Sequence, residues 1–323
     1  MAAPQPQPVI LLYHRIGRPE LDPWGLSVSP ENFVQQMAYL RQFRRPMALD
    51  GFVDGLCQGQ LPANAVAVTF DDGYVVAKPI LAAHLVPATL FLVTGAATTP
   101  TRFWWDEVAR LILNSPGAID ETITIQGVAH RLRWDAEDRP AASSRRWRAW
   151  QPAVTPRQSA YLAIWRSLRD CDEEARLQAM TWLRSRFGTI DMTSDLAMTD
   201  IQVEELLGEA VFELGAHSLL HPVLTRIGPQ DRRREIAGSR ARCTRIAGRP
   251  VTGFAYPYGA FSAEVRADVV ASGFTWACSA TSSVTGRGGI DRFALPRLTV
   301  EDWGTPKFAE VLVKKGFPDR AGT

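Results

Sequence analysis

The sequence predicts an α/β protein in which buried parallel strands alternate with helices. Three short, largely apolar runs, at residues 9–13, 66–70 and 87–93, are typical of strands that are covered on both faces. Segments with a helical spacing of apolar residues lie between such runs, so strand and helix alternate along the chain. Proteins built in this way place their functional side chains at the carboxyl ends of the strands.

The first hundred residues follow this alternation. Ser29 is a typical N-cap residue and Pro30 suits a first helical position, so a helix is predicted to start there. Phe33, Met37 and Leu40 then share one face of that helix. The other elements predicted here are a strand at 9–14, a helix at 52–57, a strand at 66–70, a helix at 75–85 and a strand at 87–93.

Between about residues 100 and 200 the alternation stops. An amphipathic helix is predicted at 103–113, and alternating residues around Gln126-Gly127 indicate a hairpin at about 122–134. Residues 139–187 are rich in Arg, Ala and Trp and read as helical. We therefore expect a single domain spanning 1–323, with a mostly helical insertion at about 100–200.

The alternation returns in the last third of the chain. Thr199 and Ser262 are predicted to cap helices, and a strand at 211–217 ends in His217. The remaining predicted elements are a helix at 229–247, a strand at 251–256, a helix from 263 to 271, a strand at 274–278 and a strand at 294–298.

Composition excludes some classes of protein. The chain has 323 residues, is 46% hydrophobic and carries a formal net charge of +2. It holds no basic run interleaved with aromatic residues, so a nucleic-acid partner is not expected. No stretch reaches the roughly 20 apolar residues of a membrane helix.

Cysteine spacing and the first residues bear on localisation. The cysteines are far apart and form no Cys-x-x-Cys pair, which argues against a disulfide framework or a structural zinc knuckle. Residues 1–8 are rich in proline and lack the features of a signal peptide. The sequence therefore predicts a cytoplasmic protein.

Two carboxylates and two histidines suggest a metal site. Asp71 and Asp72 follow the strand at 66–70, and such close like charges persist where a cation or a reacting proton needs them. His217 and His221 are four residues apart, so both imidazoles can point the same way. Either pair alone has an ordinary explanation, because Asp-Asp-Gly is a common turn composition. Together they match three protein ligands plus water, the layout of catalytic zinc.

These residues carry a family resemblance. The segments 69–74 (TFDDGY), 217–222 (HSLLHP) and 256–259 (YPYG), in this order, resemble the first three motifs of the polysaccharide deacetylases, the NodB-homology family. Residues 12–15 (LYHR) resemble the early motif of the exopolysaccharide, or poly-N-acetylglucosamine, branch. The resemblance covers about residues 9–300. It implies a distorted, incomplete (β/α) barrel, seven-stranded and TIM-like, and a divalent metal, usually Zn²⁺, with Co²⁺, Ni²⁺ or Mn²⁺ as alternatives.

The resemblance also implies roles for individual residues. Asp71 is expected to be the general base, and Asp72, His217 and His221 the metal ligands. The backbone N–H of Tyr258 is expected to help hold the oxyanion. This division is chemically sensible, because a cation polarises the carbonyl group while the unligated carboxylate accepts a proton.

The chain departs from the family pattern at two places. Many members carry an arginine just before the Pro-Tyr-Gly turn, where this chain has residues 253–255 (GFA). Arg297 is our candidate to orient Asp71 instead. No histidine follows His221, so the late histidine motif that usually supplies the general acid is missing. His14, at the end of the first strand, is our candidate to protonate the leaving amine.

Substrate contacts are predicted at three residues. Tyr74 and Pro257 belong to the first and third motifs. Trp105, with Trp104 beside it, follows the strand that ends near the site, and aromatic faces suit stacking on sugar rings.

The sequence therefore predicts a metal-dependent hydrolase that removes an N-acetyl group from an amino sugar in a saccharide or glycan precursor. Three alternatives remain open. The same chemistry could act on another N-acyl substrate, as in a de-N-formylase or a deacetylase of lipid- or nucleotide-linked sugars. The chain could also be a carbohydrate-binding protein without catalysis. A phosphate-transferring enzyme is a poorer match, since the chain lacks a Gly-rich phosphate loop.

Overall fold

The computed structural model describes residues 7–74, 78–95, 101–136, 147–188, 195–280 and 291–314, the side chain of Lys78 excepted. The chain divides into two compact units. The first unit comprises Met1–Arg18, Ser27–Pro100 and Ala197–Thr323, and the second comprises Pro19–Leu26 and Thr101–Leu196. We propose that most of the second unit is the helical insertion predicted at about 100–200.

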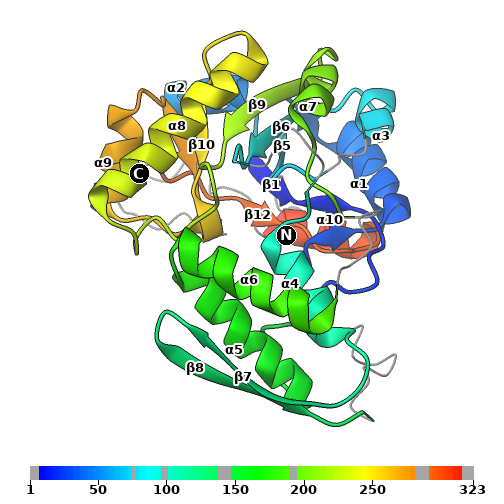
Figure 1. Ribbon diagram of the computed structural model, residues 1–323. Coiled ribbons are helices and arrows are strands. Elements are labelled where there is room, and N and C mark those ends of the chain that lie inside the picture. Colours follow the sequence, from blue (N-terminus) through cyan, green and yellow to red (C-terminus); the bar gives the residue numbers. More distant parts are fainter. Residues whose placement is uncertain are drawn as a thin grey trace. The chain divides into compact units, whose positions relative to one another are not determined.

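The first unit is built on a parallel sheet. Within the described residues its strands follow the order β11-β10-β9-β6-β5-β1-β12, with β4 beside β5, and every pairing is parallel (Figure 1). These strands are β1 (Val9–Tyr13), β4 (Arg45–Pro46), β5 (Ala65–Phe70), β6 (Ala88–Leu92), β9 (Phe212–Ala216), β10 (Gly253–Ala255), β11 (Trp276–Cys278) and β12 (Leu298–Thr299). A separate parallel pair joins β2 (Arg15–Ile16) and β3 (Ser27–Val28).

Most helices of the first unit follow the predicted positions, with small shifts at the ends, whereas the 3-10 turn at Pro257–Gly259 and the helix at Thr305–Lys314 were not predicted. The helices of this unit are α1 (Pro30–Phe43), α2 (Leu49–Gln58), α3 (Lys78–Ala83), α7 (Asp200–Leu207), α8 (Pro229–Ala247), the 3-10 turn η2 (Pro257–Gly259), α9 (Ala263–Ala271) and α10 (Thr305–Lys314). The start of the helix predicted at 75–85 falls outside the described residues. Among the described helices, none has both the length and the apolarity needed to cross a membrane.

The predicted helix caps have different outcomes. The Thr199 and Ser262 side chains accept hydrogen bonds from the first turns of α7 and α9, as predicted. Ser29 precedes α1 but makes no such bond. Its hydroxyl instead donates to Asp302, 2.6 Å away and 273 positions along the chain. Ser29 therefore stands at the predicted cap position with Pro30 as the first helical residue, but its side chain binds the distant Asp302 carboxylate and not the first turn of the helix.

Alternation along the strands separates two cores. Val66, Val68 and Phe70 of β5 belong to the cluster that packs against the helices, whereas Ala65 and Ala67 belong to a cluster shared with α2. The residues of the second cluster lie on the opposite face of the sheet, because successive strand residues point to opposite sides. By the same parity Thr69 and Asp71 continue this inner face. This inner face is where the candidate site begins.

The two ends of the strand order meet at one segment. Leu295 bridges to Cys278 of β11, and three residues later β12 pairs with β1. The strand predicted at 294–298 is therefore wrong in its extent, since the chain leaves β11 before it joins β1. Pro296 lies at this crossing and has no N–H with which to continue a ladder.

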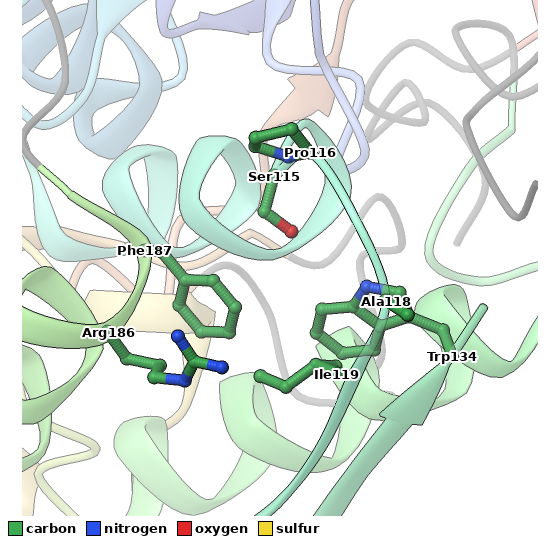
Figure 2. A pocket seen from close by; sticks show the side chains of 7 residues that line it. All are labelled: Ser115, Pro116, Ala118, Ile119, Trp134, Arg186 and Phe187. Atoms are coloured by element: carbon green, nitrogen blue, oxygen red, sulfur yellow. The ribbon is translucent and has the colours of Figure 1, made fainter. Parts of the chain in front are cut away.

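The second unit contains the predicted hairpin and helices. The hairpin strands β7 (Ile119–Ile125) and β8 (Val128–Trp134) are antiparallel and turn at Gln126-Gly127, and the helices are α4 (Trp104–Leu113), α5 (Pro156–Asp170) and α6 (Glu173–Phe187). Residues 139–146 of the predicted helical stretch lie outside the described residues. Figure 2 shows a pocket of this unit that is lined by Trp134 and Phe187, whose ring centroids are 5.9 Å apart and whose planes are inclined at 19°.

Candidate metal centre

The two adjacent carboxylates leave β5 through a tight turn. Asp72 has φ of 73° and Gly73 has φ of 110°, so the backbone reverses its course at once. The Gly73 N–H donates to the Asp71 carbonyl, and the Val93 N–H donates to the Asp72 carbonyl. This turn lets two neighbouring residues face different partners, and both carboxylates are buried.

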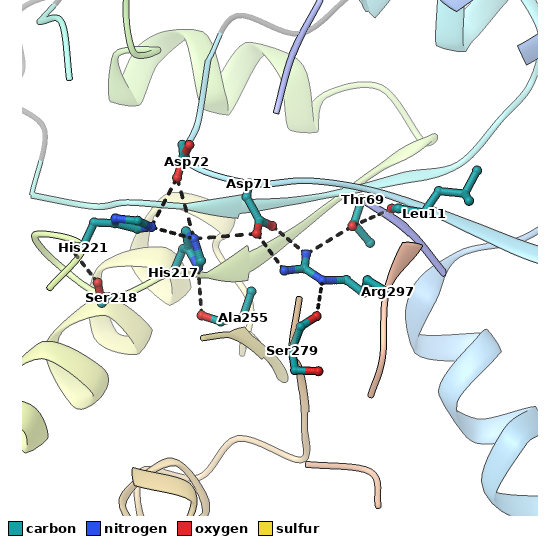
Figure 3. A network of polar contacts seen from close by, with 10 residues as sticks. All are labelled: Leu11, Thr69, Asp71, Asp72, His217, Ser218, His221, Ala255, Ser279 and Arg297. Atoms are coloured by element: carbon teal, nitrogen blue, oxygen red, sulfur yellow. Dashed lines mark hydrogen bonds and ion pairs between the residues drawn. The ribbon is translucent and has the colours of Figure 1, made fainter. Parts of the chain in front are cut away.

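Asp71 is held by Arg297. The guanidinium donates to both carboxylate oxygens, over 2.6 and 2.7 Å, and also to Thr69 Oγ1 and the Ser279 carbonyl (Figure 3). Burial by itself would raise the pKa of Asp71, but the Arg297 guanidinium, with His217 and His14, outweighs it and lowers that pKa. Asp71 is therefore anionic and fixed in orientation, which suits a proton acceptor.

Arg297 does not come from the end of β10, where many polysaccharide deacetylases carry an arginine and where this chain has residues 253–255. A Cβ atom on Gly253 would lie 2.0 Å from the Trp276 ring, so the inner face has no room for a side chain there. Arg297 enters instead from the segment between the Leu295 bridge and β12. It lies over the Phe91 ring at 5.3 Å, which shields the ion pair from one side.

His217 is oriented by a backbone bond. Its Nδ1 lies 2.8 Å from the Ala255 carbonyl oxygen, which can only accept, so Nδ1 carries the proton. Nε2 then presents a lone pair toward the carboxylates. Burial lowers the pKa of His217, which favours the neutral imidazole that a metal ligand requires.

His221 lies on a loop rather than one helical turn after His217. Ser218 and His221 have φ of 66° and 57°, so the segment is not helical. The His221 N–H donates to Ser218 Oγ over 3.0 Å, and its ring lies 4.5 Å from the ring of Tyr258. The loop still brings both imidazoles to one place, as Figure 3 shows.

The spacing of three ligand atoms fits one small cation. His221 Nε2 lies 3.2 Å from His217 Nε2 and 3.5 Å from Asp72 Oδ1, and His217 Nε2 lies 3.7 Å from Asp72 Oδ1. Tetrahedral coordination at zinc distances places neighbouring ligand atoms roughly 3.3 to 3.6 Å apart. Two imidazole lone pairs in such proximity to a carboxylate are the donor set of a divalent metal, and the predicted trio forms a possible metal site.

His14 leaves β1 beside Asp71. Tyr13 pairs with Phe70, and the Asp71 N–H donates to the Tyr13 carbonyl, so the next residues of both strands lie at the same edge. Ile10 belongs to the inner cluster, and His14 has the same parity along the strand. The charge of His14 contributes to lowering the pKa of Asp71. The acid role of His14 stays a prediction.

The predicted substrate contacts lie in different surroundings. Tyr258 has φ of 58° in the turn η2, next to the buried Pro257. Tyr74 is buried, with the Arg15 guanidinium 5.0 Å from its ring centre. Trp105 belongs to the second unit, where it is buried and stacked on Phe103 at 4.5 Å. Their contacts with substrate stay predictions.

Sequence reasoning missed two residues that support Asp71. Thr69 Oγ1 donates to the Leu11 carbonyl over 2.7 Å and accepts from Arg297, while the Ser279 carbonyl accepts from Arg297 Nε. Thr69 could have been found, because a polar residue on the inner parity of an apolar strand needs a partner. The Ser279 carbonyl carries no sequence signal, since any residue provides one.

Known proteins share this architecture. The family model described as polysaccharide deacetylase matches residues 173–277. The deacetylase PplD of Streptococcus pyogenes, solved with acetate, is 16% identical with a TM-score of 0.58, over 97% of this chain and 100% of that one. IcaB from Ammonifex degensii is 19% identical with a TM-score of 0.56, over 95% and 96%.

A third structure, a polysaccharide deacetylase from Bacillus cereus, is 15% identical with a TM-score of 0.55, over 95% of this chain and 69% of that one. None of the curated protein sequences matches this chain. The fold is that of the NodB-type deacetylases, an incomplete (β/α) barrel, as predicted. The resemblance to the polysaccharide deacetylases is confirmed as well, because the matched region contains His217, His221 and Tyr258.

Proposed function

We propose that this chain is a metal-dependent hydrolase that removes the acetyl group from the nitrogen of an amino sugar. The observation that carries the proposal is the convergence of Asp72, His217 and His221 beside an Asp71 carboxylate held by Arg297. A divalent cation, most simply Zn²⁺, would be held by the trio and would polarise the acyl carbonyl and lower the pKa of its water.

Different side chains carry out the two proton transfers of the reaction. Asp71 accepts the proton of the attacking water, and Arg297 keeps the carboxylate ionised and aimed. His14 gives a proton to the leaving amine. The backbone N–H of Tyr258 binds the oxygen on which negative charge develops. The substrate is an N-acetylated amino sugar within a saccharide or glycan precursor.

The test combines metal content with product release. Purified protein is loaded with zinc and offered a panel of N-acetyl and N-formyl amino sugars, free, in oligosaccharides and on nucleotide or lipid carriers, and acetate and formate are measured. Acetate release supports the proposal. Release of formate alone would show that the enzyme removes a formyl group and not an acetyl group. Sugar binding without release of either acid favours a non-catalytic protein.

Two variants test the roles. Asp71→Asn should lower kcat by about 10²- to 10⁴-fold while one equivalent of zinc stays bound, because it removes the proton acceptor and none of the three metal ligands. His217→Ala should lose zinc and activity together. The matched control is Asp120→Asn, which alters an exposed carboxylate paired with Arg131 in the hairpin and should leave both properties unchanged. Full activity in Asp71→Asn would falsify the base assignment.

A further inference from the structure

The loop between the two histidines adopts a backbone that its sequence does not favour. Ser218 and His221 both lie in the left-handed region, with φ of 66° and 57°, and neither is a glycine. Each such residue costs on the order of 1–3 kcal/mol, so the conformation persists only where the surroundings determine it. The surroundings of residues 218–220 therefore set the positions of both imidazoles.

A buried carboxylate on α8 accepts hydrogen bonds from this loop. Glu235 is 3% exposed, and its Oε2 accepts hydrogen bonds from the N–H groups of Leu219 and Leu220, each over 2.9 Å. Two consecutive backbone donors thus converge on one oxygen. A buried oxygen that accepts from two consecutive N–H groups fixes the backbone of residues 219 and 220 by its position.

The opposite side of the loop is held by β6 and the residues after it. The Thr94 N–H donates to the Ser218 carbonyl over 3.2 Å, and the Gly95 N–H donates to the Leu219 carbonyl over 2.6 Å. Ser218 Oγ also accepts from the His221 N–H. The carbonyl groups of Ser218 and Leu219 therefore accept from residues just after β6, and the N–H groups of Leu219 and Leu220 donate to Glu235, so the loop is held from both sides.

Glu235 reaches the loop because α8 approaches it closely. Gly238 lies one turn further along α8, and a Cβ atom there would be 2.8 Å from Leu219 Cδ1. The missing side chain lets the Leu219 side chain pack directly on the helix. Packing and hydrogen bonding therefore come from the same face of α8, at positions three apart.

We propose that Glu235 is a positioning residue that holds the 217–221 loop in its metal-binding conformation before the cation arrives. The proposal rests on the proposed function, in which His217 and His221 are metal ligands. Glu235 binds the backbone N–H groups of Leu219 and Leu220, so its effect falls on the relative placement of the two ligand atoms. Partners that hydrogen-bond metal-ligating side chains change metal affinity by about 10- to 100-fold when replaced, and we expect an effect of that order from a residue that holds the backbone between two ligands.

Three variants and one control separate geometry from charge. Glu235→Gln can place an amide oxygen where Oε2 lies and keep both bonds without the charge. Glu235→Asp keeps the charge but draws the oxygen back by one methylene. Glu235→Leu removes the acceptor. The control Ser239→Ala removes another buried group of α8, a hydroxyl that donates to the Ile236 carbonyl of its own helix.

The readouts are the Kd for Zn²⁺ alone, measured by competition with a chelator, and amide hydrogen exchange of the metal-free protein. We expect the Kd to rise about 10- to 100-fold in Glu235→Leu and by a smaller factor in Glu235→Asp. Glu235→Gln should stay near wild type, and so should Ser239→Ala. Exchange at Leu219 and Leu220 should accelerate in the same order.

The outcomes distinguish this inference from the proposed function. Wild-type zinc affinity in a folded Glu235→Leu protein overturns the positioning role. If the leucine variant does not fold, the order of the other two decides, and a Glu235→Asp protein that binds zinc as well as Glu235→Gln overturns it. If the wild-type chain binds no zinc, the proposed function fails, and exchange at Leu219 and Leu220 alone then judges whether Glu235 holds the loop.

Discussion

Each of the two units contains an arginine that is almost completely buried, and the two have different partners. Arg297 of the first unit is 1% exposed and binds the Asp71 carboxylate with two hydrogen bonds. Arg157 of the second unit is also 1% exposed, but it donates to the carbonyls of Ile112 and Ser115 and to Ser115 Oγ. The same side chain thus binds a buried carboxylate in one unit and backbone carbonyl groups in the other.

The difference lies in what each arginine controls. The last carbonyl groups of a helix lack partners within it, and Arg157 satisfies them at the end of α4 while lying over the Trp134 ring at 4.7 Å. Arg297 instead sets the ionisation of a carboxylate. A buried arginine therefore indicates a candidate functional site only when the group that it binds can gain or lose a proton.

Removal of the Arg297 guanidinium should have the largest effect. Arg297→Met leaves Asp71 as a buried, unpaired carboxylate, so the free energy of unfolding should fall by about 3–5 kcal/mol. Asp71 also loses its orientation, and kcat/KM for deacetylation should fall about 100-fold or more. Urea unfolding and steady-state kinetics measure the two effects.

The double variant Asp71→Asn/Arg297→Met provides the control. It removes both charges, so it should be more stable than Arg297→Met alone and remain inactive. An Arg297→Met protein as stable as wild type would show that the ion pair does not hold the first unit together.

Removal of the Arg157 guanidinium should affect stability and spare chemistry. Arg157→Met leaves buried carbonyl groups without donors, at about 1–3 kcal/mol for each group. We expect the free energy of unfolding, measured by tryptophan fluorescence in urea, to fall by about 3 kcal/mol. The change in kcat should be much smaller than in Arg297→Met. A loss of kcat as large as that of Arg297→Met would erase the distinction between the two arginines.

The smallest effects should come from the hydroxyl group that each arginine touches. Arg297 Nη1 donates to Thr69 Oγ1 over 3.2 Å, and Arg157 Nη1 donates to Ser115 Oγ over 2.7 Å. Thr69→Val and Ser115→Ala should each lower the free energy of unfolding by about 1 kcal/mol. Only Thr69→Val should also lower kcat. If Thr69→Val and Ser115→Ala have equal stability but different kcat values, the two arginines differ in their effect on catalysis and not in their effect on stability.

The sequence predicted much of this arrangement because strand ends and side-chain parity are local properties. Apolar runs located the strands, and Asp72, His217 and His221 stood where those runs end or shortly beyond. The structure brings their ligand atoms together, and the incomplete barrel is confirmed by the solved structures. The roles of Asp71, His14 and Tyr258 in the reaction stay predictions.

What the sequence could not predict depends on contacts between distant residues. Ser29 looks like a helix cap, but Asp302 captures its hydroxyl. The spacing of His217 and His221 suggests a helical turn, whereas the Glu235 carboxylate stabilises a loop with positive φ. In each case a contact with a residue distant in sequence determines the conformation, and neighbouring positions in the sequence do not indicate that contact.

The ion pair between Asp71 and Arg297 joins residues that are 226 positions apart. A chain made from its amino end therefore exposes Asp71, Asp72 and both histidines well before Arg297 is synthesised. The same late segment links β11 to β1, so the sheet cannot close around the carboxylate until that segment arrives. Contacts this distant in sequence slow folding. Asp71 can therefore gain its counterion only after the segment around Arg297 has been made, and a chain truncated before that segment lacks the partner of this buried carboxylate.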